Sequence, residues 1–431
     1  MISLLISFGV LIVGYAVYGR VVEKVFSPDD RQTPAVAIHD YMAGMISFRH
    51  GGASIAELSG VYLGKGAMWL MRAFSLILLV LCGTVFVTSP AALLDRLTPG
   101  WMNGTFWAVV ILIYYLAATL LPIDKLISKL YPVFGVLLMG MAAAVIGGVL
   151  FSGGRFTIPE FSLRNLHPKG TPVWPYMFIT VACGAISGFH ATQSPMIAKC
   201  IESERVGGKV FYGAMISEAV IALVWAAAGV AFYGTTQLLS DVLKSGASNV
   251  VYEISTGVLG VFGGILAVAG VVVCPITSGD TAFRSARLIL AETLGLEQKS
   301  IKNRLLITVP LLLVGGMLTW FAIVNDNGFQ IVWRYFSWSN QTLAMIALWV
   351  ATAYLVQRGR RPWDSLLTAL PAAFMSAVSV TYIMTASEGF RLGIRLSCIL
   401  GAAVALGLFV MYLVLLRRAG RSNRQGNDTL S

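Results

Sequence analysis

Polar residues interrupt an apolar stretch near the middle of the chain. The stretch begins as an apolar run over 173–183 and then reads Gly184-Ala-Ile-Ser-Gly-Phe-His-Ala-Thr-Gln-Ser-Pro195. The imidazole of His190 in this stretch could carry a proton, because histidine titrates near neutral pH. Polar groups and broken helix occur at membrane depth only where they are buried in protein or line a water-filled cavity. We therefore expect a substrate-binding segment, with a hydrogen-bonded contact between helices as the alternative. The expected substrate-binding residues are Ser187, Gly188, His190, Thr192, Gln193 and Ser194.

A second group of oxygen-bearing side chains follows a proline at the end of another apolar run. Pro275 is expected to end the regular helical hydrogen bonding there. The oxygens that follow carry one negative charge, a combination that suits Na⁺, a proton or the amino group of a ligand. The alternative is that Ser278 or Asp280 caps a cytoplasmic helix beginning near Thr281, and both interpretations could hold. The expected ion-coupling residues of this group are Thr277, Ser278, Asp280 and Thr281.

Glu218 is a carboxylate inside the apolar run 209–233. An ionisable side chain at membrane depth is costly, and it is a candidate functional residue by default. We therefore expect Glu218 to take part in ion coupling, with proton transfer as its chemistry.

Two polar pairs stand at the ends of a short segment near the N-terminus. His39-Asp40 begins the segment and Arg49-His50 ends it. Arg49 and His50 are expected at the cytoplasmic surface. The four residues are candidates for a cytoplasmic gate or for an anion contact, and a salt link at a helix end is the alternative.

A run of polar residues also lies inside the apolar segment 329–356, where the chain reads Ser337-Trp-Ser-Asn-Gln-Thr342. Polar groups at such a depth are costly unless they are paired. Ser339, Asn340 and Gln341 are expected to contact substrate. Hydrogen bonding between helices is an equally good explanation.

Membrane-spanning helices must position these residues. The chain has 431 residues, of which 57% are hydrophobic and 12% are charged, and its mean hydropathy is +0.78. Soluble proteins carry about 25% charged residues. We therefore predict an all-α polytopic membrane protein with about eleven transmembrane helices, plus a short helical piece at 35–48. The predicted spans are 2–19, 70–93, 104–121, 131–151, 173–198, 209–233, 254–278, 304–324, 329–356, 363–386 and 391–416.

The basic residues indicate how these spans are oriented. The net charge is +11, but most of the Lys and Arg fall on one set of alternate loops, as the positive-inside rule requires. This distribution places the N-terminus outside and the C-terminus in the cytoplasm, and it explains the basicity without a nucleic-acid partner. Residues 1–418 form a single predicted transmembrane domain, and the polar tail 419–431 is expected to be disordered and cytoplasmic.

Other kinds of chemistry lack their signatures in the sequence. It contains no phosphate-binding lysine motif, no HExxH and no nucleophile elbow, and its four histidines are too scattered to suggest a zinc site. The five cysteines lie in or beside apolar runs without a CxxC pair, which is typical of packing residues. We expect no metal and no cofactor, apart from Na⁺ or H⁺ as a coupling ion.

Several motifs together resemble the carbon starvation protein A (CstA) family. The resemblance covers nearly the whole chain and is specific as a set. It rests on Tyr18-Gly-Arg20, Phe26-Ser-Pro-Asp-Asp-Arg31, His39-Asp-Tyr41, Ser47-Phe-Arg-His-Gly-Gly-Ala-Ser54, Gly188-Phe-His-Ala-Thr-Gln-Ser-Pro195, Gly213-Ala-Met-Ile-Ser-Glu218, Gly279-Asp-Thr-Ala-Phe-Arg-Ser-Ala-Arg287 and Ser339-Asn-Gln341.

The resemblance implies secondary transport across the bacterial inner membrane, linked to carbon starvation. Members of the family are associated with uptake of peptides and some with uptake of pyruvate. The resemblance also implies a LeuT-like inverted repeat of the amino acid–polyamine–organocation type. It places a small-molecule substrate and membrane lipid among the partners, with no obligate protein partner.

The chain departs from the family pattern between Pro34 and His39, where roughly one and a half spans are missing. Topology leads to the same conclusion, because both flanks of 35–48 fall on the cytoplasmic side and the piece cannot complete a crossing. It is either re-entrant or the remaining part of a longer helix. The chain is thus a short form, which could be a functional reduced transporter, an internally deleted variant or a sequence artefact.

Three functions are consistent with these residues. The leading one is an ion-coupled importer of a small organic nutrient, either a peptide or a pyruvate-like carboxylate, and it is not an enzyme. The second is a non-transporting membrane sensor or scaffold, which the missing segment favours. The third is an intramembrane hydrolase that uses Ser187 or Ser194 with His190.

Overall fold

The computed structural model describes residues 2–13, 38–120, 124–158, 160, 162, 164–181, 186–201, 203, 207–358 and 362–428. The junction between Pro34 and His39 and residues 14–19 of the first predicted span lie outside the described residues, as does Gly184. The position of the missing segment therefore stays a prediction.

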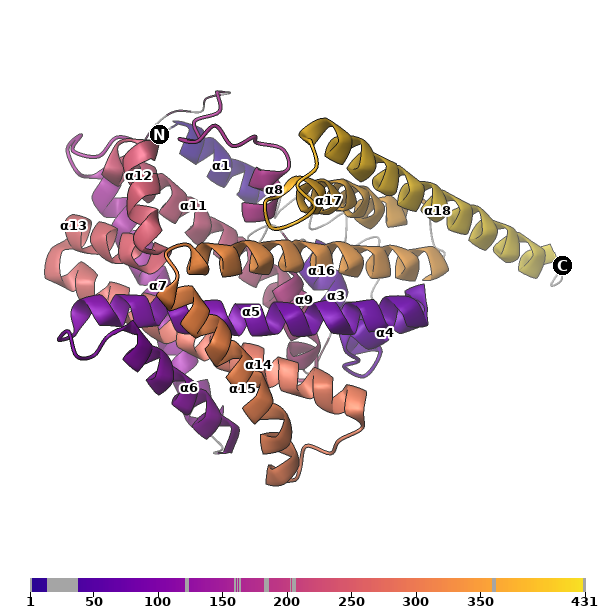
Figure 1. Cartoon of the computed structure of the whole chain (residues 1–431). Coiled ribbons are helices and arrows are strands. Elements are labelled where there is room, and N and C mark those ends of the chain that lie inside the picture. Colours follow the sequence, from indigo (N-terminus) through magenta and orange to yellow (C-terminus); the bar gives the residue numbers. More distant parts are fainter. Residues whose placement is uncertain are drawn as a thin grey trace. The chain divides into compact units, whose positions relative to one another are not determined.

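The described residues form helices and loops without a strand, which confirms the all-α fold class (Figure 1). In chain order the elements are α1 (Ile2–Val13), α3 (Ile38–Arg49), α4 (Ile55–Leu63), α5 (Lys65–Leu97), α6 (Gly104–Leu120), α7 (Asp124–Leu150), α8 (Tyr176–Thr180), α9 (Gly188–Ala198), η3 (Gly208–Tyr212), α11 (Gly213–Tyr233), α12 (Thr236–Val242), η4 (Leu243–Ser245), α13 (Ala247–Val268), η5 (Ala269–Val273), α14 (Cys274–Leu294), α15 (Ile301–Val324), α16 (Gly328–Arg358), η6 (Pro362–Ser365), α17 (Leu366–Thr385) and α18 (Ile394–Asp428).

Within the described residues, 8 helices are long and apolar enough to cross a membrane. Two shorter apolar helices, Ser3–Val13 and Gly104–Leu120, coincide with two further predicted spans. The protein is therefore a polytopic membrane protein, while the count of eleven spans and the LeuT-like repeat stay predictions. The domain boundary at 418, which falls inside α18, also stays a prediction.

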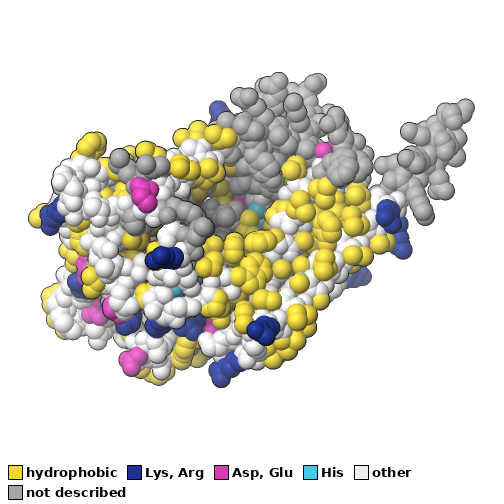
Figure 2. Space-filling model, turned by 90° about the horizontal axis from the view of Figure 1, so that it is seen from above, with side chains coloured by type: hydrophobic (Ala, Val, Ile, Leu, Met, Phe, Trp, Pro, Cys, Tyr) yellow, Lys and Arg dark blue, Asp and Glu magenta, His cyan; other side chains and the backbone are white. Residues whose placement is uncertain are grey.

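Hydrophobic side chains lie on the surfaces of several long helices. On α18, for example, Ile399, Leu406 and Val410 are exposed. Figure 2 shows hydrophobic side chains over much of the face that it presents. A soluble protein rarely exposes apolar patches of this size, whereas helices in lipid must. This surface agrees with contact between the helices and lipid tails.

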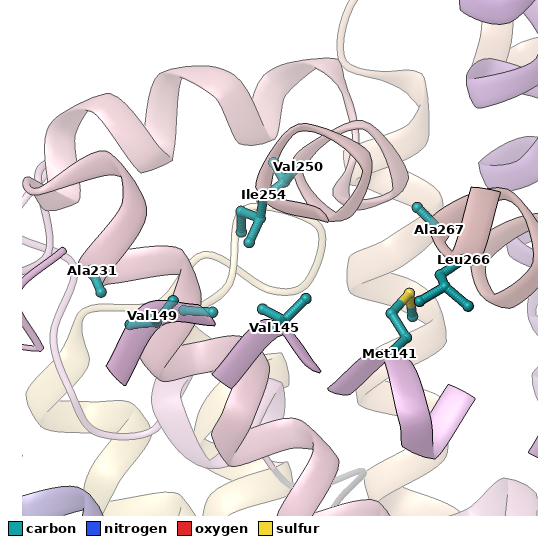
Figure 3. Packing of buried hydrophobic residues seen from close by; sticks show 9 residues of the cluster. Met141, Val145, Val149, Ala231, Val250, Ile254, Leu266 and Ala267 are labelled. Carbon is teal, nitrogen blue, oxygen red and sulfur yellow. The ribbon is translucent and has the colours of Figure 1, made fainter. Parts of the chain in front are cut away.

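The helices form two compact units, each built from separate parts of the chain. The first comprises residues 1–8, 79–171 and 220–336. In it, α7 packs against α13, and α15 packs against both α6 and α14. Met141, Val145 and Val149 recur every fourth residue on α7, so they lie on one face of that helix. They meet buried residues of α13 such as Ile254 in the hydrophobic core shown in Figure 3.

The second unit comprises residues 9–78, 172–219 and 337–431. In it, α17 packs along α18 and beside α8, while α3 packs against α9 and η3. Ile179, Val378 and Tyr382 are buried together in its core. Most of the predicted site residues belong to this unit, and α3 and α9 carry several of them.

The predicted piece 35–48 is a helix, α3, over Ile38–Arg49. Its 12 residues extend about 18 Å at 1.5 Å per residue, which is less than the hydrocarbon thickness of about 30 Å. Residues 39–47 are all buried. The described part of this helix is therefore shorter than the membrane, and protein surrounds most of it. Whether the piece 35–48 crosses the membrane stays a prediction.

The predicted interruption of the span 173–198 is confirmed. Between α8 and α9, the described residues Val181, Ile186 and Ser187 are not helical. Ser187 has φ −144° and ψ 121°, which is extended backbone, and α9 begins at the next residue. The break therefore places a new helix start inside the apolar stretch.

Regular α-helical hydrogen bonding is interrupted before Pro275, as predicted, but the helix does not end there. A π-helical turn, η5, leads directly into α14, and Pro275 lies in the first turn of α14. Proline lacks an amide hydrogen and its ring crowds the preceding turn, and a wider π-turn accommodates both effects. Ser278 and Asp280 therefore lie inside α14, and the alternative that one of them caps a helix starting near Thr281 is wrong.

Candidate functional site

Four titratable side chains from three helices form a continuous chain of contacts in the second unit. Asp40 on α3 lies between two histidines, with its Oδ1 2.7 Å from His39 Nδ1 and its Oδ2 2.9 Å from His190 Nδ1. His190, on α9, then reaches Glu218 on α11, with Nε2 3.4 Å from Oε2. The imidazole of His190 thus bridges two carboxylates.

Hydrogen-bond chemistry assigns protons to this chain. An ionised carboxylate only accepts hydrogen bonds. His39 and His190 therefore each carry a hydrogen on Nδ1 and donate it to Asp40. His190 Nδ1 also lies 2.9 Å from the sulfur of Met215, a weak acceptor on α11.

Exposure rises steadily along the chain of contacts. The side chain of His39 is 1% exposed and that of Asp40 is 6% exposed. The side chain of His190 is 25% exposed and that of Glu218 is 38% exposed. The described residues therefore enclose the His39 end and leave the Glu218 end the least covered. His39 Nε2 has no hydrogen-bond partner among the described residues.

Asn340 fixes the start of α9 to α16. Its Oδ1 accepts the backbone N–H of Phe189 at 2.7 Å and the hydroxyl of Ser187 at 3.2 Å. Ser187 in turn caps α9, because its Oγ accepts the backbone N–H of His190. The first amides of a helix have no partner within it, so these two acceptors satisfy groups that would otherwise be orphaned.

Gly188 makes this close approach feasible. A Cβ at this position would overlap the backbone carbonyl oxygen of Asn340 and would also press on Leu343. Glycine is therefore required where α9 touches α16. For Ser187, Gly188 and Asn340, the observed contacts match the helix-to-helix alternative, and their role in substrate binding stays a prediction.

The other polar residues of α9 bond within their own helix. Thr192 donates to the carbonyl oxygen of Phe189 at 2.6 Å, and Ser194 donates to that of His190 at 2.8 Å. Gln193 donates to the hydroxyl of Thr192 at 3.1 Å. The imidazole of His190 reaches outward from α9 to α3 and α11.

The polar run on α16 is buried from Ser337 to Thr342 except for Trp338. Thr342 shares a hydrogen bond of 2.6 Å with Ser379 on α17, and Trp338 donates to the carbonyl of the same residue at 3.2 Å. Gln341 Oε1 is buried with no hydrogen-bond partner among the described residues. Gln341 therefore keeps an unused acceptor, which fits its predicted role as a ligand contact.

The four residues predicted to form a gate divide between the two ends of α3. His39 and Asp40 belong to the chain of titratable groups, whereas Arg49 donates to the hydroxyl of Tyr354 at 3.0 Å. His50 Nδ1 donates to the carbonyl of Ile46 at 2.7 Å, so its Nε2 accepts the hydroxyl of Tyr62 at 2.9 Å. The C-terminal end of α3 therefore belongs to a separate cluster of aromatic and basic side chains.

The predicted ion-coupling residues on α14 lie in the first unit. Asp280 Oδ2 accepts a hydrogen bond from Arg284 at 2.9 Å, so its charge is matched one turn along the same helix. Thr277 and Thr281 donate to backbone carbonyls of the turn before them. Asp280 is thus paired with a cation, and a coupling role for Thr277, Ser278, Asp280 and Thr281 stays a prediction.

Sequence reasoning singled out three of these residues but did not group them. It assigned Asp40 to a gate, His190 to substrate binding and Glu218 to ion coupling, and the structure brings the three together. It also missed Met215, which lies three residues before Glu218 and therefore on the same face of α11. The one available signal was that each titratable group stands in an otherwise apolar run.

Comparison with known proteins identifies the family. The model of the family described as carbon starvation protein CstA matches residues 98–256 and 236–382, which is more than half of the chain. The chain belongs to the CstA family. This match confirms the resemblance found in the motifs, and it agrees with a multi-pass membrane protein.

Individual relatives agree with this assignment. A protein of Haemophilus influenzae, named as an uncharacterized membrane protein, is 33% identical over 345 residues, covering 56% of this chain and 93% of that protein. The peptide transporter CstA of Campylobacter jejuni is 24% identical over 495 residues, covering 86% of this chain and 70% of that protein. The pyruvate/proton symporter BtsT of Escherichia coli is 28% identical over 117 residues, covering 26% of this chain and 16% of the symporter.

The chain is a short form of the family. Its alignment with the Campylobacter transporter extends over 495 positions, more than the 431 residues of the chain, so the relative contains segments that this chain lacks. The named relatives are transporters, which supports the broad assignment of a membrane transporter.

Proposed function

We propose that this CstA-family chain is an ion-coupled secondary transporter that imports a small organic nutrient across the bacterial inner membrane during carbon starvation. The observation that carries the proposal is the partly exposed imidazole of His190. It stands at a helix break in an apolar stretch and touches two carboxylates from other helices. Discontinuous helices at membrane depth are the usual substrate sites of secondary transporters.

The contacts around α9 and α16 support a small polar substrate. Both ring nitrogens of His190 already face carboxylates, whereas the buried Oε1 of Gln341 has no partner among the described residues and would accept an N–H or O–H group of a substrate. The relatives named as a peptide transporter and as a pyruvate/proton symporter both point to such ligands. A peptide and pyruvate each have a carboxylate, so both belong to the proposal, with the polar residues of α9 and 339–341 of α16 as contacts.

The coupling ion is either H⁺ or Na⁺ in this proposal. Glu218 is the candidate that faces the site on α9. Asp280, with Thr277, Ser278 and Thr281, is the second candidate, although its pairing with Arg284 makes it a weaker cation ligand. The proposed orientation has the N-terminus outside and the C-terminus in the cytoplasm, with no obligate protein partner.

The two alternatives to a transporter are a sensor or scaffold and an intramembrane hydrolase. The absence of segments that longer relatives contain favours a non-transporting sensor or scaffold. A hydrolase needs a serine activated by a base, whereas Ser194 donates its hydrogen to a backbone carbonyl and Ser187 donates its own to Asn340. We therefore propose a transporter rather than an enzyme.

Uptake by the purified chain in proteoliposomes tests the proposal. Labelled pyruvate and labelled trialanine are supplied with an inward proton gradient, with an inward Na⁺ gradient and with neither. We expect one probe to accumulate above the level in protein-free vesicles, and the His190→Ala variant to abolish uptake at equal membrane insertion. Absence of uptake under every condition, together with a copurifying partner, would favour the scaffold alternative.

A second comparison tests whether the chain can transport without the segment that longer relatives contain. A chimera that carries the segment of a longer relative after Pro34 is compared with the chain as it stands. Equal uptake by the two would establish the chain as a functional reduced form. Uptake by the chimera alone would contradict the proposal for the short form.

A further inference from the structure

Asp40, His190 and Glu218 are arranged so that a proton is required to connect them. Ionised carboxylates accept hydrogen bonds and donate none. Asp40 uses the hydrogen on His190 Nδ1, at 2.9 Å. A hydrogen between His190 Nε2 and Glu218 Oε2, which are 3.4 Å apart, must therefore come from a second proton. Imidazole is a stronger base than a carboxylate, so this proton resides on His190, which is then an imidazolium.

Removal of this proton would leave an unfavourable contact. The lone pair of Nε2 would then face an oxygen of an ionised carboxylate, and two negative charges would remain around one neutral imidazole. Like charges repel more strongly in a low-dielectric interior than in water. The deprotonated chain of contacts is therefore expected to open between His190 and Glu218, since Asp40 holds His190 on its other side.

We infer that Asp40, His190 and Glu218 form a single proton-binding site whose proton links the start of α11 to α9, and that this proton is the coupling ion of transport. This inference rests on the proposed function and makes it specific. One proton binds and is released in each cycle, and Na⁺ takes no part. Asp280 has no coupling role in this scheme.

The surroundings of the site agree with exchange of one proton from one side. Glu218 is the most exposed member and His39 is the most buried, so in this scheme the proton is exchanged at the Glu218 end. Among the described residues, the charged or titratable groups that face the site are His39 and Asp40 from α3, His190 from α9 and Glu218 from α11. The basic residues at the other end of α3 bond to tyrosines instead.

The anchoring of the neighbouring helices determines what moves. Asn340 ties α9 to α16, and α3 packs against α9. The start of α11 meets His190 through Glu218 and through Met215, both on one face of the helix. The contact that depends on a proton is therefore the one between α11 and α9, which makes the first turns of α11 the element that responds to protonation.

The first experiment detects the proton without any substrate. The full chain in lipid bilayers, labelled with ¹⁵N-histidine, is studied by solid-state NMR, which is practical because the sequence has only 4 histidines. The His190 signals are identified by their loss in the His190→Gln variant. We expect both ring nitrogens of His190 to carry hydrogen near neutral pH in the wild type.

A glutamine at 218 can donate its amide hydrogen to a neutral imidazole, so it removes the need for the proton. In the Glu218→Gln variant, we therefore expect Nε2 of His190 to become a hydrogen-free acceptor at the same pH. The control is Asp241→Asn, which changes an exposed carboxylate paired with Lys244 on α12 and should leave the His190 signals unchanged. Identical His190 signals in Glu218→Gln and wild type would overturn the inference.

The second experiment links the site to transport. With a pH difference of about one unit at zero membrane potential, coupling to one proton permits about tenfold accumulation of pyruvate or trialanine. Glu218→Gln should lose this accumulation, yet it should still exchange internal for external substrate, because exchange needs no net proton movement. Asp241→Asn should behave like the wild type.

The two experiments separate failure of the inference from failure of the proposed function. If the wild type moves neither probe, the transport proposal fails, while the NMR result still decides whether the proton site exists. If the wild type accumulates a probe and Glu218→Gln accumulates it equally with the same proton dependence, the inference is overturned. Accumulation driven by Na⁺ alone would overturn it as well.

Discussion

Nδ1 of His190 lies 2.9 Å from Oδ2 of Asp40, although the two residues are 150 positions apart in the sequence. Asp40 also accepts the hydrogen of His39 Nδ1, so one buried carboxylate orients two imidazoles. The short helix α3 therefore places the Asp40 carboxylate against His190 in the first turn of α9.

Asp40→Asn should abolish uptake while the protein still inserts into the membrane. An amide carries no charge to stabilise a protonated His190. It keeps one acceptor oxygen, and its NH₂ group is a donor that cannot accept the hydrogen of the second histidine. Uptake of pyruvate and trialanine per unit of inserted protein measures the effect. Asp241→Asn is the matched control, and normal uptake by Asp40→Asn would exclude this carboxylate from the mechanism.

Asn340→Ala should destabilise the protein by about 1 to 3 kcal/mol, the penalty for leaving a buried donor unsatisfied. The backbone N–H of Phe189 and the hydroxyl of Ser187 would both lose their acceptor. Asn340→Asp keeps an oxygen that accepts both bonds and places a negative charge at the start of α9, which the helix dipole favours. The thermal unfolding temperature in detergent should therefore be well above that of Asn340→Ala for both the wild type and Asn340→Asp. Equal stability of Ala and wild type would contradict the anchoring of α9 by this side chain.

Gly188→Ala should lower stability by about 1 to 3 kcal/mol and reduce uptake, because overpacking forces the backbone apart. Its new methyl group would overlap the backbone of Asn340. Gly213→Ala on α11 is the control, since a Cβ there has nothing within 4 Å and alanine favours helix. A loss of stability in Gly213→Ala as large as that in Gly188→Ala would refute the steric explanation.

Asp280→Asn should cost about 2 kcal/mol of stability through loss of a charged hydrogen bond with Arg284. The side chain of Arg284 is partly exposed, so we expect less than the full cost of a broken buried pair. The double variant Asp280→Asn/Arg284→Met removes both charges and should recover part of that loss. Proton-driven accumulation by the double variant would show that the pair is structural, and its loss at normal stability would restore Asp280 as a coupling residue.

The aromatic cluster at the C-terminal end of α3 should lose part of its contribution to the stability of the protein at alkaline pH. Burial, followed by the neighbouring Tyr354, raises the pKa of the Tyr62 phenol. A raised pKa means that the folded state favours the neutral phenol. This contribution is complete below the unfolded pKa of about 10 and is lost as pH rises through the folded value. Thermal unfolding measured from pH 8 to 11 should show a decline that is smaller in Tyr62→Phe than in the wild type. The same decline in both proteins would assign it to other groups.

The amino-acid sequence by itself determined the class of the protein. Long apolar runs with few charges can satisfy their backbone groups in lipid only as helices, and so the polytopic fold followed from composition. The interruption at Ser187 was likewise visible, because glycines and polar side chains stand where a spanning helix would be apolar. The behaviour of Pro275 was not, since proline can either end a helix or sit beside a π-turn, and packing decides between them.

The grouping of the site residues was decided by the tertiary structure. Asp40, His190 and Glu218 lie in three separate helices, and nothing in their spacing indicates which helices meet. Contacts between distant segments depend on how side chains fill the space between helices, as where Gly188 lets α9 approach Asn340. Local patterns therefore indicate that a titratable group lies in an apolar segment, whereas the side chain that it contacts is set by packing across the whole unit.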